Sequence, residues 1–431
     1  AAGAVLKPQG GNCAVLPKVS CRCGGRKRGT GKMNFVFISP HFPENYWNFC
    51  DRLRANGVNV LGIGDAPYET LPALLKSALT EYYRVDNMEN YDEMLRAMGF
   101  FTFKYGKIDW VESNNEYWLE QDARLRTDFN ITTGIKSAEI EKFKRKSVMK
   151  TYYQKAGIPT ARWCVTADVT EAQAFAKTVG WPVIAKPDNG VGANGTHKFK
   201  NKTELNKFFQ QEGPNAASYI LEEFVDGEIV TFDGVADANA EPIYAASHVT
   251  PDSIMEIAHG KKPMWYYVAP EISPELRKMG EAALKAFGAK SRFFHLEFFR
   301  LKTAKPSLGN AGDILGLEVN MRPSGGFSAD MFNFANSTDV YKIWADMVAY
   351  DHSTISNEGR EHFYCCYCGR RDGKNFVMDH AAIMAKYGDR IKMVQRIPKA
   401  LAGAMADMMY LANMRTEAEK AEYYRDLLAT K

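Results

Sequence analysis

The stretch "GLEVNMRPSGG", residues 316–326, has the alternation of a β-strand whose two faces differ in chemistry. Apolar side chains occupy every second position, and a carboxylate, an amide and a guanidinium lie between them. The polar face consists of Glu318, Asn320 and Arg322, and the apolar face of Leu317, Val319 and Met321. Burying such a polar set is costly unless something binds to it, so this face is predicted to be a binding site.

A second strand is predicted just upstream, in "FFHLEFFR" at residues 293–300. Its Glu297 lies among phenylalanines and would be stranded without a cation. If the two strands are neighbours, Glu297, Glu318 and Asn320 share one face and offer the oxygen ligands that Mg²⁺ prefers when it also holds phosphates. A surface sheet with its polar face outward would suit Glu318 and Asn320 but not Glu297. His295, on the same face, is either a satisfied core histidine or a functional group.

A glycine-rich segment, "DNGVGANGTHKF", follows the strand "VIAKP" that ends with Lys186. Glycines let backbone N–H groups approach an anion closely, which suits phosphate. A strand follows rather than a helix, so the segment is no Walker P-loop, and a flexible turn is the alternative. The glycines concerned are Gly190, Gly192 and Gly195.

Two further features complete the pattern. Lys146 lies in "KRKSVMK", within the helix that we expect over residues 137–157, with Ser137 as its N-cap. The strand "YILEEFVDGE", residues 219–228, could offer backbone groups to a purine and a carboxylate to ribose, although a plain edge strand has the same sequence.

In this order, the lysines, the glycine-rich hairpin, the E-E-F-V segment and the E…E-x-N-x-R pattern resemble the ATP-grasp superfamily, which includes biotin carboxylase and carbamoyl-phosphate synthetase. The resemblance covers roughly residues 34–345. It implies an α/β N-terminal (pre-ATP-grasp) domain followed by an α+β ATP-grasp fold and an extra α+β C-terminal region. The expected parts are a disordered basic extension at 1–32, the pre-ATP-grasp domain at 33–125, the ATP-grasp domain at 126–345, and a strand hairpin with helices at 346–431.

The resemblance also implies roles for individual residues. Lys146, Lys186 and the Gly190, Gly192 and Gly195 hairpin would contact the ATP phosphates, and Glu222, Glu223, Phe224 and Val225 would form the adenine hinge. Glu228 would lie near the ribose, with Glu223 as the alternative because Glu228 directly follows Gly227. Glu297, Glu318 and Asn320 would hold Mg²⁺, or Mn²⁺ in its place, and Arg322 would stabilise the transferred phosphoryl group and the state that follows.

The implied reaction is ligation: ATP activates a carboxylate as an acylphosphate, and an amine attacks it. Two alternatives remain open, namely a carboxylase that uses bicarbonate and a non-catalytic ATP-binding regulatory protein. Further substrate contacts are expected in residues 247–267, with His248, His259, Lys261 and Lys262, and at the strand end that carries Glu112, Asn114 and Glu116.

The composition is that of an ordinary globular protein, with 45% hydrophobic and 25% charged residues among 431. Seven lysines and arginines lie in residues 1–32 without an acid, so the rest of the chain is mildly acidic despite a formal net charge of +4. That tail is interpreted as an upstream extension of a start at Met33, or alternatively as a nucleic-acid-binding arm. We expect small-molecule carboxylate and amine substrates and no nucleic-acid or membrane partner, while the sequence leaves the oligomeric state open, with a homodimer as one option.

The eight cysteines lack the spacing of a disulfide framework, which favours a reducing cytoplasm. Three of them, Cys365, Cys366 and Cys368, lie in the strand-like "HFYCCYCG", followed by Asp372-Gly373 as a hairpin turn signal. Structural burial is expected for these three cysteines, and a zinc site is the alternative.

Overall fold

The computed structural model describes residues 32–190, 195–252 and 263–431. The expectations for the tail up to residue 31, and for Gly192, His259, Lys261 and Lys262, lie outside the described residues. Residues 33–431 form one compact unit that contains three β-sheets.

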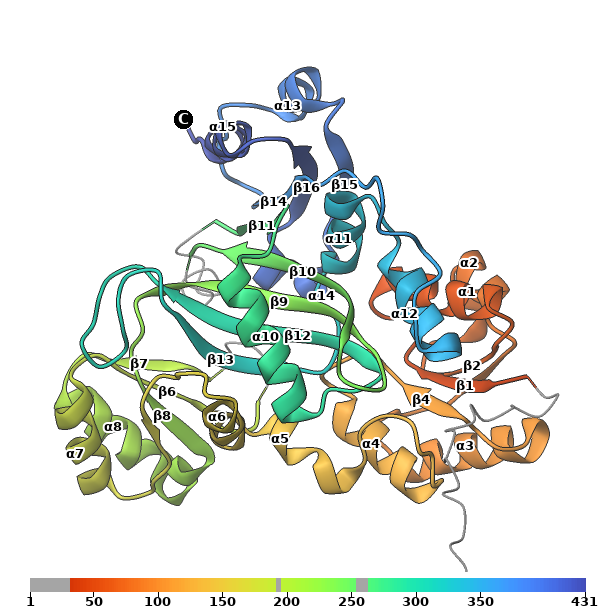
Figure 1. Ribbon diagram of the computed structural model, residues 1–431, viewed down its shortest axis with the longest axis horizontal. Coiled ribbons are helices and arrows are strands. Elements are labelled where there is room, and N and C mark those ends of the chain that lie inside the picture. The colour runs from red at the N-terminus through yellow and green to blue at the C-terminus, as the bar shows by residue number, and fades with distance from the viewer. Residues whose placement is uncertain (1–31, 191–194, 253–262) are drawn as a thin grey trace, which may run out of the picture. The chain divides into compact units, whose positions relative to one another are not determined.

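The first sheet is parallel, with the strand order β3-β2-β1-β4. Its central strand, "NFVFI", is buried at all five positions, as expected for a strand covered by helices on both faces. The helices alternate with the strands along the chain, which gives the α/β pattern predicted for this region (Figure 1). The elements are β1 (Asn34–Ile38), α1 (Trp47–Ala55), β2 (Asn59–Gly64), α2 (Ala73–Ala78), β3 (Glu81–Arg84), α3 (Tyr91–Tyr105), β4 (Trp110–Glu112) and α4 (Leu119–Asp128).

The second sheet is small and antiparallel, with the order β5-β8-β6-β7. One of its faces packs against α7 and α8 through a cluster that includes Val183, Leu221 and Leu205. The opposite face carries Lys186 and Glu222, as strand alternation requires. The elements are β5 (Trp163–Cys164), α7 (Val169–Val179), β6 (Val183–Pro187), β7 (His197–Phe199), α8 (Lys202–Glu212) and β8 (Tyr219–Glu223).

The third sheet has eight antiparallel strands in the order β13-β12-β9-β10-β11-β14-β16-β15. Its strands are β9 (Gly227–Ala236), β10 (Pro242–Thr250), β11 (Trp265–Ala269), β12 (Arg292–Leu301), β13 (Ile314–Asn320), β14 (Tyr364–Arg370), β15 (Ile391–Arg396) and β16 (Met408–Met414). Its helices are α5 (Glu141–Lys144), α6 (Lys146–Lys155), α10 (Pro274–Phe287), α11 (Ser328–Asn336), α12 (Val340–Tyr350), α13 (His380–Tyr387), α14 (Lys399–Met405) and α15 (Glu417–Leu428). The chain after residue 345 therefore contributes strands to the same sheet as the predicted binding strands.

The prediction of a hairpin directly after β14 is wrong. A turn does form at Asp372-Gly373, but the chain then enters α13, and β14 pairs with β11 and β16. The turn signal at Asp372-Gly373 was therefore correct. The strand pairing expected from it was not, because β14 lies inside the large sheet between β11 and β16. Cys365, Cys366 and Cys368 are fully buried free thiols, which confirms their structural burial.

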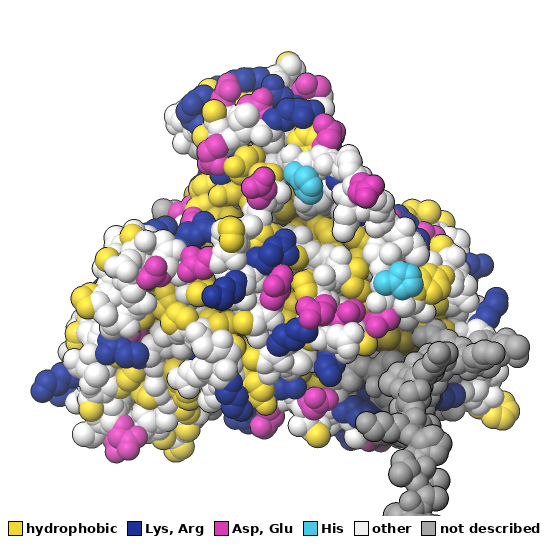
Figure 2. All heavy atoms as spheres, in the orientation of Figure 1, with side chains coloured by type: hydrophobic (Ala, Val, Ile, Leu, Met, Phe, Trp, Pro, Cys, Tyr) yellow, Lys and Arg dark blue, Asp and Glu magenta, His cyan; other side chains and the backbone are white. Residues whose placement is uncertain are grey.

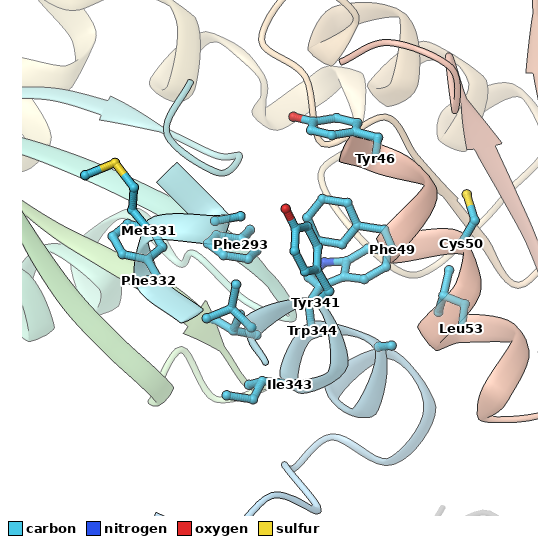
Figure 3. Close-up of a cluster of buried hydrophobic side chains, with 14 of the residues drawn as sticks. Tyr46, Phe49, Cys50, Leu53, Phe293, Met331, Phe332, Tyr341, Ile343 and Trp344 are labelled. Carbon is cyan, nitrogen blue, oxygen red and sulfur yellow. The ribbon is translucent and has the colours of Figure 1, made fainter. Parts of the chain in front are cut away.

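An aromatic cluster joins the first sheet's helix α1 to α12 and β12 (Figure 3). Phe49 of α1 lies 4.8 Å from the Tyr341 ring and 5.0 Å from the Trp344 ring, between ring centroids. Edge-to-face pairs of this kind add to the burial of large apolar surfaces. The first sheet is thereby anchored to the large sheet near the start of β12.

The surface shown in Figure 2 carries lysine and arginine side chains interspersed with aspartate and glutamate, without a continuous patch of one sign. Within the described part of the chain, every helix falls short of the length and apolarity that a bilayer crossing requires.

Candidate active site

The two acidic strands are neighbours, as the sequence predicted. In the antiparallel β12–β13 pair, Glu297 lies opposite Glu318 and His295 opposite Asn320. All four side chains therefore point to one face of the sheet. The Glu297 and Glu318 side chains are 22% and 16% exposed, so a ligand can reach both carboxylates.

The two carboxylates differ in their proton affinity. Burial and the nearby charge of Glu297 raise the pKa of Glu318, against the opposing charge of Lys146. Burial would also raise the pKa of Glu297, but the hydrogen bond and charge of His295 outweigh it and lower that pKa. Two facing carboxylates with an amide oxygen beside them are a donor set that fits Mg²⁺, which would let both ionise.

Lysines face these carboxylates from the other elements. Lys146 Nζ lies 3.4 Å from Glu318 Oε1 and donates to the Gly190 carbonyl oxygen at 3.0 Å. Lys186 Nζ is 2.6 Å from Glu222 Oε2, and Lys150 Nζ is 2.9 Å from Glu222 Oε1. Sequence reasoning missed Lys150, although its spacing of one helical turn from Lys146 places both on the same face of α6.

Two ion pairs hold Lys150 and Lys186 against the Glu222 carboxylate. Burial would raise the pKa of Glu222, but the two lysines outweigh it and lower the pKa to about 2. Burial and the charge of Lys186 lower the pKa of Lys150, against the attraction of Glu222. The side chain of Lys186 is 12% exposed and that of Lys150 only 1%, so Lys186 is the more accessible cation for a phosphate.

The prediction of one continuous helix over residues 137–157 is wrong. The chain forms α5 and α6, separated at Arg145, whose backbone is extended and bridges to Asn189. Ser137 opens a short 3₁₀ turn and its side chain caps no helix. Asp188, which follows β6, receives hydrogen bonds from Ser147 N at 2.7 Å and Ser147 Oγ at 2.8 Å. A residue distant in sequence therefore caps α6, which local propensity could not reveal.

Replacing Asp188 by alanine is expected to lower the free energy of unfolding by about 1–2 kcal/mol, because the start of α6 loses its cap. Nucleotide affinity should fall as well, since Lys146 is the first residue of α6. Asp168→Ala is the matched control, because Asp168 caps α7, away from Lys146. Urea unfolding and ADP titration of both variants measure the two effects. Equal loss of ADP affinity in the two variants would contradict a role of the α6 cap in placing Lys146.

The glycine-rich segment is described only at its two ends. Gly190 is half-buried, and its carbonyl oxygen accepts a hydrogen bond from Lys146 Nζ. Gly195 has a φ of +71°, and a Cβ there would lie 3.0 Å from Pro187 Cγ, so another residue would be strained at this position.

The residues expected to form the adenine hinge lie in different environments. The Glu223 carboxylate is fully buried and engaged by Arg162, Lys305 and Ser307, which hold the pKa of Glu223 at about 2 against the effect of burial. This contradicts the alternative in which the Glu223 carboxylate binds ribose, because its oxygens are already satisfied. Glu228 pairs with Arg300 at 2.9 Å and remains partly exposed. Val225 is buried, and the Phe224 ring lies 3.9 Å below Lys198 Nζ.

Arg322 lies where the first sheet meets the acidic strands. Its Nη2 donates to Asn320 Oδ1 at 3.4 Å, and its Nε lies 3.6 Å from Glu116 Oε2. Glu116 also pairs with Lys144 at 2.9 Å. The strand end singled out in the sequence therefore supplies Glu116 beside Arg322.

Glu112, from the same strand end, belongs to a buried ionic network instead. Its Oε2 lies 3.0 Å from Arg126 Nη2 and 3.4 Å from Arg292 Nη2, and Arg292 also donates to the Met321 carbonyl oxygen. Asp122, which accepts from Ser113, completes the network. Burial and the charge of Glu112 raise the pKa of Asp122 to about 7.

Asp122→Asn is expected to stabilise the protein more at pH 8 than at pH 5. Because the folded-state pKa is raised, the native state binds a proton that the unfolded state has lost, and stability falls as pH rises from about 4 to about 7. Asparagine has the charge of the protonated acid, so it removes this slope, and its stabilising effect should be about 3 kcal/mol larger at pH 8 than at pH 5. Urea unfolding of both proteins at the two pH values measures it. A difference that does not change with pH would contradict the raised pKa.

A buried polar cluster underlies Glu297. His295 lies between two carboxylates, with Nδ1 2.5 Å from Asp233 Oδ1 and Nε2 2.9 Å from Glu297 Oε1. His248 Nδ1 is 3.0 Å from Asp233 Oδ2, and His248 lies on β10. Burial alone would lower the pKa of His295, but Asp233 and Glu297 raise it to about 9. Sequence reasoning missed Asp233, which is hidden within an apolar strand.

Known proteins resemble this chain both in sequence and in fold. Residues 145–287 match the family described as carbamoyl-phosphate synthase L chain, ATP binding domain. The L-arginine-specific L-amino acid ligase of Bacillus subtilis is 23% identical over 254 residues, which are 57% of this chain and 58% of that protein. The carbamoyl phosphate synthase large chain of Hyperthermus butylicus is 20% identical over 298 residues, which are 67% of this chain and 26% of that protein. This chain thus spans less than two thirds of either relative.

Solved structures share the fold over nearly the whole chain. An L-amino acid ligase from Bacillus licheniformis superposes with a TM-score of 0.67 at 16% identity, covering 93% of this chain and 98% of that one. A biotin carboxylase from Campylobacter jejuni gives a TM-score of 0.65 at 15% identity, covering 91% and 90% of the two chains. Residues 145–287 thus match an ATP-binding domain family, and the chain shares its overall fold with an L-amino acid ligase and a biotin carboxylase.

Proposed function

We propose that the protein is an ATP-dependent ligase that activates a carboxylate as an acylphosphate and joins it to an amine, releasing ADP and phosphate. The observation that carries this proposal is the register of β12 and β13, which sets Glu297 opposite Glu318 on the face that Lys146 approaches. Cations and paired carboxylates around one space suit phosphoryl transfer, in which a protein mainly positions groups and neutralises charge.

Different residues of the chain would bind the nucleotide and stabilise the reacting groups. Lys146 and Lys186 would bind the ATP phosphates, and the backbone of the adenine hinge, residues 222–225, would receive the base. Glu297, Glu318 and Asn320 would hold Mg²⁺, which when bound neutralises phosphate oxygens. Arg322, placed beside Asn320, would stabilise the negative charge that develops on the transferred phosphoryl group.

The relatives point to amino acids as the substrate class. Ligases acting on L-amino acids and on D-alanine are among the proteins similar to this chain. We therefore propose that an amino acid supplies the amine. Amino acids are also the compounds to test as the carboxylate substrate, because forming a dipeptide requires one amino acid to supply the carboxylate and another to supply the amine.

The direct test is ADP release by the full chain with ATP, Mg²⁺ and pairs of amino acids. A ligase releases ADP and phosphate only with a suitable acceptor pair, and mass spectrometry of that mixture should show the condensed product. ADP release that depends on bicarbonate would instead favour a carboxylase, a reaction type represented among the similar solved structures. ATP binding without ADP release for any acceptor, including bicarbonate, would favour a regulatory protein.

His295→Asn is expected to raise the Mg²⁺ concentration for half-maximal activity about tenfold, because His295 orients the Glu297 carboxylate without being one of the proposed ligands. His380→Asn is the matched control, since His380 lies on α13, where its Nδ1 is 3.1 Å from the Tyr410 hydroxyl oxygen. A structural role alone would lower the melting temperature and leave the Mg²⁺ dependence unchanged. Activity at several Mg²⁺ concentrations, together with thermal unfolding, separates the two roles.

A further inference from the structure

A cavity of about 280 Å³ lies at the start of β10, outside the candidate active site. This part of β10 pairs with β9 on one side, whereas β11 pairs only with Ser247, His248 and Val249 further along. The walls come from β10, α10, α11 and the segment between α12 and β14. The lining residues are Pro242, Ile243, Tyr244, Ala245, Arg277, Asn336, Asn357, Arg360 and His362.

The charge of the lining is positive, because it includes two arginines and no acid. Arg360 Nε donates to the Ser356 carbonyl oxygen at 2.8 Å, while its Nη2 is buried and has no hydrogen-bond partner among the described residues. Burial lowers the pKa of Arg360 accordingly. Arg277 has a single ion-pair partner in the described chain, Glu281, at 3.6 Å on an exposed helix surface. Arg360 is half-buried and has no acidic partner among the described residues, so an anion in the cavity would supply a counter-charge for it.

The other polar groups of the cavity are held in fixed positions. Asn336 Nδ2 donates to the Tyr244 hydroxyl at 2.9 Å and to the Phe332 carbonyl oxygen at 3.2 Å. Asn336 Oδ1 therefore accepts from His362 Nδ1, 2.9 Å away. This arrangement leaves His362 Nε2 without a partner in the described chain. The cavity thus has a preorganised polar wall opposite apolar surface from Ile243 and Ala245.

We propose that this cavity is a second ligand site, which binds a small molecule that carries a carboxylate or phosphate group and a short apolar portion. Guanidinium groups bind both kinds of anion through paired hydrogen bonds, and two arginines line the cavity without an acid among its lining residues. The volume suits a ligand smaller than a nucleotide. Because the lining shares no residue with the candidate active site, occupancy of the two sites can be measured separately.

The test is calorimetric titration of the full chain saturated with Mg²⁺ and ADP, so that the nucleotide site is filled. The probes are inorganic phosphate, phosphoenolpyruvate, butyrate and glutarate. At least one should bind saturably with a dissociation constant below about 1 mM. Arg360→Gln should weaken that binding at least tenfold without changing ADP affinity. Comparing the phosphate-bearing and carboxylate-only probes identifies which anion the site prefers.

Two further variants keep the proposal falsifiable. Arg277→Gln alters the opposite wall and should also weaken the probe if Arg360→Gln fails to fold. Arg425→Gln, exposed on α15, is the control and should bind like the wild type. Absence of saturable binding for every probe, or unchanged binding in both cavity variants, overturns the proposal. If ADP itself does not bind, the titrations are run without it, and that failure counts against the ligase function rather than the cavity.

Discussion

Replacing Glu318 by glutamine should lower the rate of ADP release by about a thousandfold or more. The substitution removes one of two facing carboxylates, and with it the charge that a divalent cation and Lys146 would share. The fold should survive, because burial and Glu297 already raise the pKa of Glu318 and a neutral side chain relieves that repulsion. We expect the free energy of unfolding to stay within about 1 kcal/mol of wild type.

The matched control for this substitution is Glu422→Gln. Glu422 is an exposed glutamate of α15 that pairs with Lys386, away from the acidic strands. Coupled-enzyme measurement of ADP, at saturating ATP and Mg²⁺ with the best acceptor pair, compares the variants. Near-normal turnover of Glu318→Gln would remove Glu318 from the proposed reaction.

Lys186→Met is expected to weaken ADP binding about a hundredfold, because a charge-assisted contact to phosphate contributes about 2–3 kcal/mol. Burial would lower the pKa of Lys186, but Glu222 and Glu318 outweigh it and raise the pKa, so the wild-type side chain stays charged. The cost in stability should be moderate, since Glu222 keeps Lys150 as a buried partner. Titration with ADP and urea unfolding measure the two effects.

Lys150→Met separates direct from indirect contributions in the same cluster. Lys150 contacts the same carboxylate but is almost completely buried, so it should affect nucleotide binding only through Glu222. We expect a smaller loss of ADP affinity than for Lys186→Met, and a larger loss of stability. Lys202→Met, on the exposed start of α8, should change neither. An equal or greater loss of ADP affinity in Lys150→Met would contradict the direct role of Lys186.

Strand alternation was sufficient to predict the centre of the site. Both acidic strands have period-two patterns, and their pairing places Glu297 opposite Glu318 as expected. Such patterns are reliable because a shift of one residue would turn the apolar positions out of the core. The roles assigned to these residues remain predictions that the proposed measurements test.

Interactions between distant segments could not be predicted in the same way. The helix over residues 137–157 has good local propensity, yet a bridge from Arg145 to Asn189 divides it. Asp233 lies in an apolar strand, and only the fold brings His248 and His295 to its two oxygens. Glu223 directly follows Glu222 in sequence but faces the other side of β8, where Arg162 and Lys305 engage it. In each case the decisive partner is distant in sequence.

The break at Arg145 has a mechanical consequence. The first turn of α6 is clipped to the end of β6 by Asp188, while Tyr153, two turns later, donates to the Glu318 carbonyl oxygen of β13 at 3.1 Å and packs against Gly316. The short helix α6 is therefore attached both to the small sheet, through Asp188, and to the large sheet, through Glu318. Because contacts to both sheets hold α6, Lys146 at its start is kept between the end of β6 and the strand that carries Glu318.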